Sequence, residues 1–142
     1  MPSQEDSFPD QQLGTFQTLV DIVARLRAPG GCPWDREQTH YSLKRHLLEE
    51  SYEVIEAIDQ GDPDRLSEEL GDLLVQIAFH ADIAREAGDF HLEEVLRKIN
   101  SKLVRRHPHV FSDGQAKNAR EVERNWEQIK AEERKEKGEI KS

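Results

Sequence analysis

The sequence feature that most constrains the fold is a concentration of acidic residues between Glu49 and Asp72. This window holds ten acidic residues and a single basic residue, Arg65. It accounts for the whole net charge of −9, because the remaining 19 acidic and 19 basic residues cancel. Apolar residues recur within it at intervals of three and four, which is the spacing of an amphipathic helix. We therefore expect helices that carry acids on one face and apolar residues on another.

A turn near the middle of the window divides it into two helices. Asp62 is a favourable N-cap, and Pro63 suits the first helical position. We expect helices over residues 40–60 and 63–87, with Gly88 ending the second. Three further helices are predicted over 11–27, over 91–106 and from Asn118 onwards, with a loop over 32–39. Since no segment alternates with period two for long enough to be a strand, the predicted fold is all-α, an antiparallel helical bundle.

The length of 142 residues is that of one domain. We expect a disordered leader over 1–10, a folded domain over 11–133 and a charged flexible tail over 134–142. Hydrophobic and charged residues each make up 35% of the chain, so a monomer would bury only a modest core.

The helix over 63–87 is apolar nearly all round. Its predicted core stripe consists of Leu66, Leu70, Leu73, Leu74, Ile77 and Ala81. Val75, Phe79 and Ile83 lie away from that stripe and need a second cover. We expect this cover to come from another copy of the chain, in an obligate homo-oligomer (a dimer or a tetramer). The alternative is that the first or the fifth helix covers them.

Several classes of protein are disfavoured by composition. No run of about 18 apolar residues exists, so no membrane span is expected. Residues 1–10 lack the basic and apolar regions of a signal peptide. Cys32 is the only cysteine, which excludes an internal disulfide and makes a cytoplasmic protein the default expectation. General binding to nucleic acid is not expected, because it needs a basic face.

Two pairs of carboxylates lie at matching heights on either side of the turn. Glu53 pairs with Glu69, and Glu50 pairs with Asp72 one helical turn further away. Packed helices have axes about 8–10 Å apart, so these four carboxylates can converge in a small volume. They either spread into water as a solvated acidic face or surround a hard cation. Oxygen ligands with an incomplete shell favour Mg²⁺ or Mn²⁺.

The acidic residues also form a recognisable pattern. Glu49, Glu50 and Glu53, followed by Glu69 and Asp72, resemble the paired acidic motifs of the all-α nucleoside triphosphate pyrophosphohydrolases. Three further stretches are similar to the MazG family specifically: residues 31–40, 102–111 and 125–130. The resemblance covers about residues 14–133.

This resemblance implies hydrolysis of nucleoside triphosphates, NTP or dNTP, to the monophosphate and pyrophosphate, as nucleotide-pool housekeeping. It also implies dependence on Mg²⁺, with Mn²⁺ as a substitute, and a homo-oligomer. The residues that match the family's metal ligands are Glu50, Glu53, Glu69 and Asp72. One alternative is a dUTP or phosphoribosyl-ATP pyrophosphohydrolase of the same fold. The alternative of another class is a non-catalytic acidic helical module that binds a partner.

Two carboxylates, Glu49 and Glu53, are the candidate catalytic groups. Glu53 is at the same time a predicted metal ligand. Glu49 directly precedes the predicted ligand Glu50 and lies on the same acidic face of the helix. We expect it to orient or deprotonate the attacking water. The alternative is that Glu49 is an outer-shell or second-metal ligand.

Six residues are expected to contact the substrate: Trp34, Lys102, Arg105, Arg106, Trp126 and Lys130. Lys102 and Arg106 share one face of a basic helix. This face either binds the triphosphate or is simply exposed to solvent. Trp126 can stack on a base while Lys130 holds phosphate, the alternative being a core tryptophan and a surface lysine. Trp34 either covers the substrate pocket or fills space between packed elements. The resemblance matches all of these except Trp34 and Arg105 to positions around the nucleotide.

Overall fold

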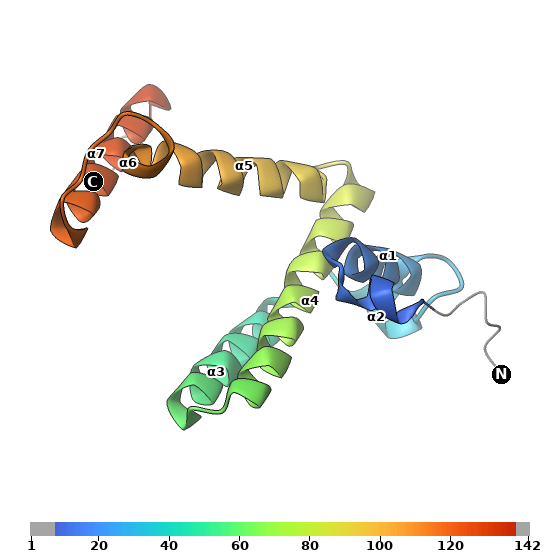
Figure 1. Ribbon diagram of the computed structural model, residues 1–142. Coiled ribbons are helices and arrows are strands. Elements are labelled where there is room, and N and C mark those ends of the chain that lie inside the picture. The colour runs from blue at the N-terminus through green and yellow to red at the C-terminus, as the bar shows by residue number, and fades with distance from the viewer. Residues whose placement is uncertain (1–7, 139–142) are drawn as a thin grey trace. The chain divides into compact units, whose positions relative to one another are not determined.

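The computed structural model describes residues 8–138, and its regular elements in that range are all helical, which confirms the all-α prediction. None of the described helices is both long and apolar enough to cross a membrane. A short 3₁₀ helix, η2 (Asp10–Gly14), comes first. The α-helices that follow are α1 (Phe16–Arg27), α2 (Pro33–Glu37), α3 (Lys44–Gln60), α4 (Pro63–Ala87), α5 (Leu92–Arg105), α6 (Pro108–Phe111) and α7 (Ala119–Glu136) (Figure 1).

The predicted helix ends agree well with the structure where a cap defines them. Asp62 caps α4 by accepting from the backbone N–H groups of Asp64 and Arg65, and Gly88 ends α4 in the left-handed conformation. Asn118 caps α7 by accepting from the N–H of Glu121. The sequence did not predict the two short helices α2 and α6. Each begins with a proline at its first position, within a segment too short to show helical periodicity.

Residues 1–7 of the predicted leader and 139–142 of the predicted tail lie outside the described residues. The chain divides into two compact units, an amino-terminal unit that ends at Leu92 and a carboxy-terminal unit that begins at Glu93. Each is described by itself below.

The core of the amino-terminal unit lies between α1 and α4. Val23, Leu43 and Phe79 are buried there together with Ala78. Leu19, Val75 and Ile83 pack against this cluster. The helix α1 therefore covers the face of α4 for which we expected another subunit. That expectation was wrong, and its alternative, cover by the first helix, is confirmed (Figure 1).

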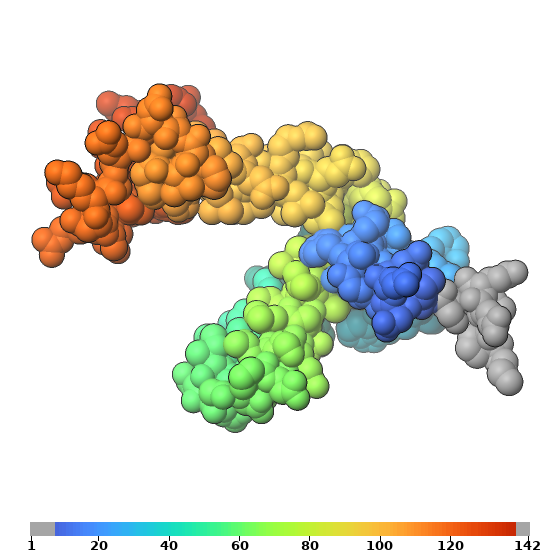
Figure 2. All heavy atoms as spheres, viewed as in Figure 1, coloured from blue at the N-terminus to red at the C-terminus, as the bar shows by residue number. Residues whose placement is uncertain are grey.

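The stripe of α4 that was predicted to be core is largely exposed instead. Leu70, Leu74 and Ile77 are 45%, 39% and 41% exposed. The adjoining helix α3 also exposes apolar side chains, namely Leu47, Leu48, Tyr52, Ile55 and Ile58. The atoms of α3 and α4 are in contact along the hairpin, and in the view of Figure 2 neither α1 nor α2 covers its turn end.

A buried ion pair fastens α1 to α4. The Arg27 guanidinium donates to Asp82 at 3.0 Å, and the side chains are 3% and 7% exposed. The same guanidinium donates to the backbone carbonyl oxygens of Asp35 and Gln38, both at 3.2 Å. One buried cation thus joins α1, α4, the middle of α2 and the residue that follows α2. Burial of charge is tolerated here because the guanidinium is paired and hydrogen-bonded.

Replacement of Arg27 by Met is expected to lower the free energy of unfolding by about 3 kcal/mol, because the buried Asp82 would lose its buried partner and keep only the half-exposed Arg85. Urea denaturation measures this change. The matched control is Arg36→Met, which removes an exposed arginine from α2. Adding Asp82→Leu to Arg27→Met should recover part of the loss. An unchanged unfolding midpoint for Arg27→Met would contradict this role.

In the carboxy-terminal unit, a shared carboxylate joins α5 to α7. Glu133 accepts from Arg105 Nε at 2.5 Å and from Arg106 Nη2 at 2.8 Å. Hydrogen bonds from Arg106 and then Arg105 lower the pKa of Glu133 to about 2. Arg106 also lies over the ring of Trp126, with its Cζ 5.1 Å from the ring centroid. These contacts fix Trp126 and both arginines in one arrangement.

The Glu133 pair predicts a specific loss of stability in acid. The folded-state pKa of about 2 lies below the unfolded value of about 4.3, so the pair stabilises fully above the unfolded value. This contribution is lost as the pH falls through 4.3 towards 2. The difference in unfolding free energy between the native protein and Glu133→Gln should be constant near neutral pH and shrink below about pH 4.5.

Urea denaturation at several pH values, followed by Trp126 fluorescence in a Trp34→Phe background, measures that difference. Glu123→Gln on the exposed side of α7 is the control and should show no such dependence. A difference that grew as the pH fell would contradict the assignment.

Candidate functional site

The α3–α4 hairpin brings three predicted metal ligands together. Glu50 on α3 and Glu69 and Asp72 on α4 each offer a carboxylate oxygen, and these oxygens all lie within 4.8 Å of one another. The turn at Gly61–Pro63 sets this register, because it places residues 50 and 72 at similar distances along antiparallel helices. We call these three residues the carboxylate cluster.

The carboxylate cluster is electrostatically unfavourable by itself. Burial, followed by the charges of Asp72, Glu53 and Glu49, raises the pKa of Glu50. Burial also raises the pKa of Glu69, with further contributions from Glu53 and Glu50. Within the described residues, Glu50 Oε2 is buried and has no hydrogen-bond partner. The cluster therefore holds negative charge that the protein itself only partly compensates.

A divalent cation fits this donor set. All three groups are carboxylates, which are the ligands of hard cations such as Mg²⁺ and Mn²⁺. The unpartnered Glu50 oxygen is a buried acceptor that a cation would satisfy. Two members of the cluster are half-buried and one is exposed, so the site is open to solvent on one side. An ion there could keep water ligands and accept phosphate oxygens.

Glu53, the fourth predicted ligand, is not in the cluster. Its Oε2 accepts from Arg65 Nη2 at 2.7 Å. The same guanidinium nitrogen lies 3.7 Å from Glu69 Oε2, so Arg65 contacts a cluster member and Glu53 together. The sequence analysis did not assign Arg65 a role. The available signal was its position as the single base among ten acids.

Glu49 lies beside the cluster and not within it. Its side chain is 61% exposed and pairs with Arg45 Nε at 3.9 Å, one turn back along α3. It still acts on the cluster, since its charge contributes to the raised pKa of Glu50.

Trp34 lies near the same end of α3. Its ring meets that of His46 edge-on, with centroids 5.8 Å apart, and the residue is 53% exposed. His46 precedes Glu50 by four residues and so shares its face of α3. The backbone of the α2 segment is held by the buried Arg27. Trp34 is thus an exposed aromatic ring anchored about one helical turn from the carboxylate cluster.

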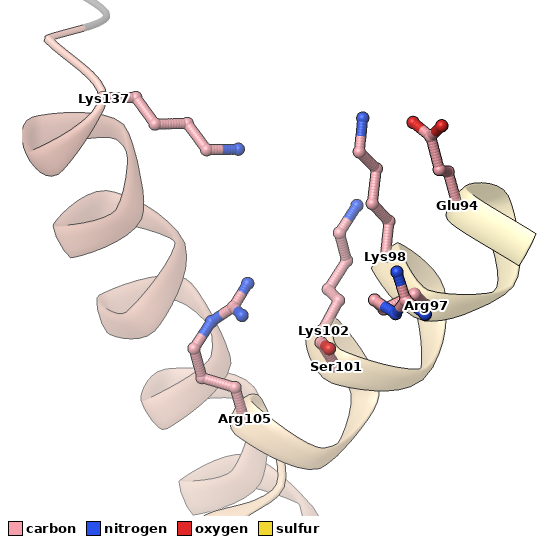
Figure 3. A pocket seen from close by; sticks show the side chains of 7 residues that line it. All are labelled: Glu94, Arg97, Lys98, Ser101, Lys102, Arg105 and Lys137. Carbon is pink, nitrogen blue, oxygen red and sulfur yellow. The ribbon is translucent and has the colours of Figure 1, made fainter. Parts of the chain in front are cut away.

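The carboxy-terminal unit contains a cationic pocket of about 670 Å³ (Figure 3). Its lining residues are Glu94, Arg97, Lys98, Ser101, Lys102, Arg105 and Lys137. In the close-up, Lys137 extends from the end of α7 towards the space that the side chains of Lys98 and Lys102 enter from α5. Among the described residues of the lining, Glu94 is the only acid. Two predicted substrate-binding residues, Lys102 and Arg105, therefore belong to one pocket.

The other predicted substrate residues of this unit lie around Glu133 and Trp126. Arg106 and Lys130 line a smaller cavity of about 150 Å³ with Glu133. The Trp126 ring packs against Arg106 and meets His107 edge-on at 5.1 Å. It also lines a separate cavity of about 350 Å³. Trp126 is therefore in part a packing residue, yet part of it still borders open space.

The comparisons with known proteins agree with this arrangement. The model of the MazG nucleotide pyrophosphohydrolase domain matches residues 38–111, a range that contains the carboxylate cluster, Glu49 and Glu53. The crystal structure of a mazG-related protein from Thermotoga maritima matches with a TM-score of 0.68 and 30% identity. That match covers 81% of this chain and 98% of the other.

Longer proteins are also similar to this chain. The nucleoside triphosphate pyrophosphohydrolase/pyrophosphatase MazG of Thermotoga maritima is 55% identical over 119 residues, which are 84% of this chain and 45% of that protein. The nucleoside triphosphate pyrophosphohydrolase of Escherichia coli is 51% identical over 123 residues, or 86% of this chain and 47% of the relative. The chain thus spans about half the length of these relatives.

The matched domain covers more than half of the chain, and the mazG-related structure is matched over almost its full length. Three of the four carboxylates that were predicted to converge, Glu50, Glu69 and Asp72, also lie in one cluster. This protein belongs to the MazG family of nucleotide pyrophosphohydrolase domains.

Proposed function

We propose that this protein hydrolyses nucleoside triphosphates, NTP or dNTP, to the monophosphate and pyrophosphate with the help of Mg²⁺. The observation that carries the proposal is the carboxylate cluster of Glu50, Glu69 and Asp72, in a chain of the MazG family. Two longer relatives carry the name nucleoside triphosphate pyrophosphohydrolase. The proposal includes a housekeeping role in the nucleotide pool and a cytoplasmic location.

The reaction requires water to attack the α-phosphorus, with pyrophosphate as the leaving group. A bound Mg²⁺ supplies positive charge to the phosphate oxygens on which negative charge builds up. In this proposal Glu50, Glu69 and Asp72 hold the ion, and Glu53 lies next to them. Glu49 is exposed beside the cluster and is the candidate to accept a proton from the attacking water. Trp34 is the candidate to cover the substrate.

The cations of the carboxy-terminal unit are proposed to bind the polyphosphate. Among residues 8–138, no ion pair joins Arg97, Lys98, Lys102 or Lys137 to an acidic side chain, so their charges are available to an anion. Arg105 adds a guanidinium that Glu133 already orients. Charge-assisted hydrogen bonds to phosphate are among the strongest that a protein surface makes. Arg106, Trp126 and Lys130 are proposed to contact the nucleoside side of the substrate.

We also propose a homo-oligomer, a dimer or a tetramer. The support is the apolar surface that the α3–α4 hairpin exposes, including Leu70, Leu74 and Ile77 on α4 and Tyr52 and Ile55 on α3. Apolar surface of this extent is typical of an interface between proteins. A second copy of the chain is the occupant proposed here.

A panel of NTPs and dNTPs incubated with Mg²⁺ tests the activity. Pyrophosphate and the nucleoside monophosphate are expected as the first products. Orthophosphate as the first product would mean attack at the γ-phosphorus and would contradict the proposal. Absence of any product across the panel would favour the non-catalytic acidic module. A strong preference for dUTP or for phosphoribosyl-ATP would identify one of the narrower activities.

Replacement of Glu69 by Gln is expected to lower kcat/KM by about 100-fold or more, because it removes one charged oxygen ligand from a cluster of three. Steady-state release of pyrophosphate measures the change. Glu68→Gln is a matched control, since it changes the neighbouring exposed residue of α4 outside the cluster. Circular dichroism should show that both variants keep their helices. Equal activity of Glu69→Gln and Glu68→Gln would refute the assignment.

Replacement of Lys102 by Gln is expected to raise KM for a triphosphate about tenfold, because a charge-assisted hydrogen bond to phosphate is lost. The effect should weaken at high salt, where exposed charges are screened. Lys117→Gln, which removes an exposed lysine outside the cationic pocket, is the control. The same KM for the native protein and Lys102→Gln would remove this residue from the substrate site.

A further inference from the structure

Arg65 makes contacts with four side chains at the turn end of the hairpin. Its Nη1 donates to Gln60 Oε1 at 2.6 Å and lies 3.4 Å from Glu56 Oε1. Its Nη2 donates to Glu53 Oε2 at 2.7 Å and lies 3.7 Å from Glu69 Oε2. The side chain is 26% exposed. One guanidinium therefore bridges α3 and α4 next to the carboxylate cluster.

Two of these contacts concern the proposed metal site directly. Glu69 belongs to the carboxylate cluster, and Glu53 is the predicted ligand that stays outside it. A carboxylate oxygen that accepts a short hydrogen bond from a guanidinium has a lone pair committed to that donor. A divalent cation would seek the same lone pairs. Arg65 and a metal ion are therefore competitors for Glu53 and, more weakly, for Glu69.

We propose that Arg65 is a resident counter-cation that sets the affinity of the carboxylate cluster for a divalent ion. It holds Glu53 outside the cluster and places a positive charge beside Glu69, so an ion binds against it. Arg65 is a positioning residue in this account and does not touch the reacting atoms. The inference rests on the proposed function, because the ion is the one that the proposed hydrolysis uses.

Electrostatic repulsion and the release of Glu53 set the direction and the size of the effect. Removal of Arg65 takes away a positive charge that repels the ion, and it releases a carboxylate that can join the ligands. With a dielectric constant close to that of water and partial screening by salt, the repulsion between one positive charge and a nearby divalent ion corresponds to about three- to tenfold in a dissociation constant. A purely structural role for Arg65 would give the opposite sign, because disordered ligands bind an ion less tightly.

The test is direct titration of the metal-free protein with Mn²⁺ alone, by isothermal calorimetry or by the electron paramagnetic resonance of free Mn²⁺. Arg65→Gln should lower the dissociation constant about three- to tenfold relative to the native protein. Arg45→Gln is the matched control. It removes the same charge from the same hairpin, but Arg45 is 85% exposed and forms a long ion pair with Glu49, at 3.9 Å. Its dissociation constant should stay close to that of the native protein.

A double-variant cycle isolates the part played by Glu53. In a Glu53→Gln background, Arg65→Gln should improve Mn²⁺ binding by a smaller factor, because no carboxylate remains to be released. The same factor in both backgrounds would overturn the claim that Arg65 holds Glu53 away. An unchanged or larger dissociation constant for Arg65→Gln alone would overturn the proposal as a whole.

The outcomes separate this inference from the proposed function. If the native protein binds Mn²⁺ and Arg65→Gln binds it equally, only the inference fails. If the native protein binds no Mn²⁺ at millimolar concentrations, the metal site and the inference fail together. Should Arg65→Gln not fold, Arg65→Lys serves in its place. Lysine keeps the charge but lacks the planar fork that contacts several acceptors, so a smaller gain in affinity is expected.

Discussion

Mutual repulsion between the carboxylates of α3 and α4 is the constraint around which the amino-terminal unit is organised. The turn capped by Asp62 fixes the register that puts Glu50 opposite Asp72, and the same register makes the repulsion unavoidable. The protein compensates in two ways. Arg65 neutralises the end of the hairpin nearest the turn. Further along, Glu50 and Glu69 respond to burial and to neighbouring acids with raised pKa values, which is the signature of charge without a sufficient partner.

The rest of the amino-terminal unit supports only one end of this hairpin. The helix α1 and the Arg27–Asp82 pair hold the second half of α4, while the half that carries Glu69 and Asp72 packs on α3 alone. The carboxylate cluster thus sits on a hairpin whose apolar surface remains partly exposed. In the proposed homo-oligomer a second copy of the chain would cover these side chains and would also stiffen the site.

Sequence patterns predicted those features of the fold that depend on neighbours along the chain. The bounds of α4, the Asp62 and Asn118 caps and the register of Glu50 with Asp72 all follow from local spacing. The contacts that were missed join distant residues. Arg27 meets Asp82, 55 positions later, and nothing in the spacing of either residue indicates the other. The face of α4 covered by α1 was wrongly predicted for the same reason, because an all-round apolar helix does not reveal which neighbour packs on which side.

The site residues show the same division in chemical terms. Carboxylates at helical spacing predict convergence, but they do not predict how charge is shared once the helices meet. Glu53 has the spacing of a ligand, and yet it lies outside the cluster because a guanidinium within reach offers it a hydrogen bond at 2.7 Å. A cluster that was fully neutralised by its own arginines would be more stable and less able to bind an ion. The window from Glu49 to Asp72 has one arginine for ten acids, and within the described residues a buried Glu50 oxygen is left without a hydrogen-bond partner. The uncompensated charge that lowers stability is therefore the same property that suits the cluster to a divalent cation, as expected where stability and function compete for the same residues.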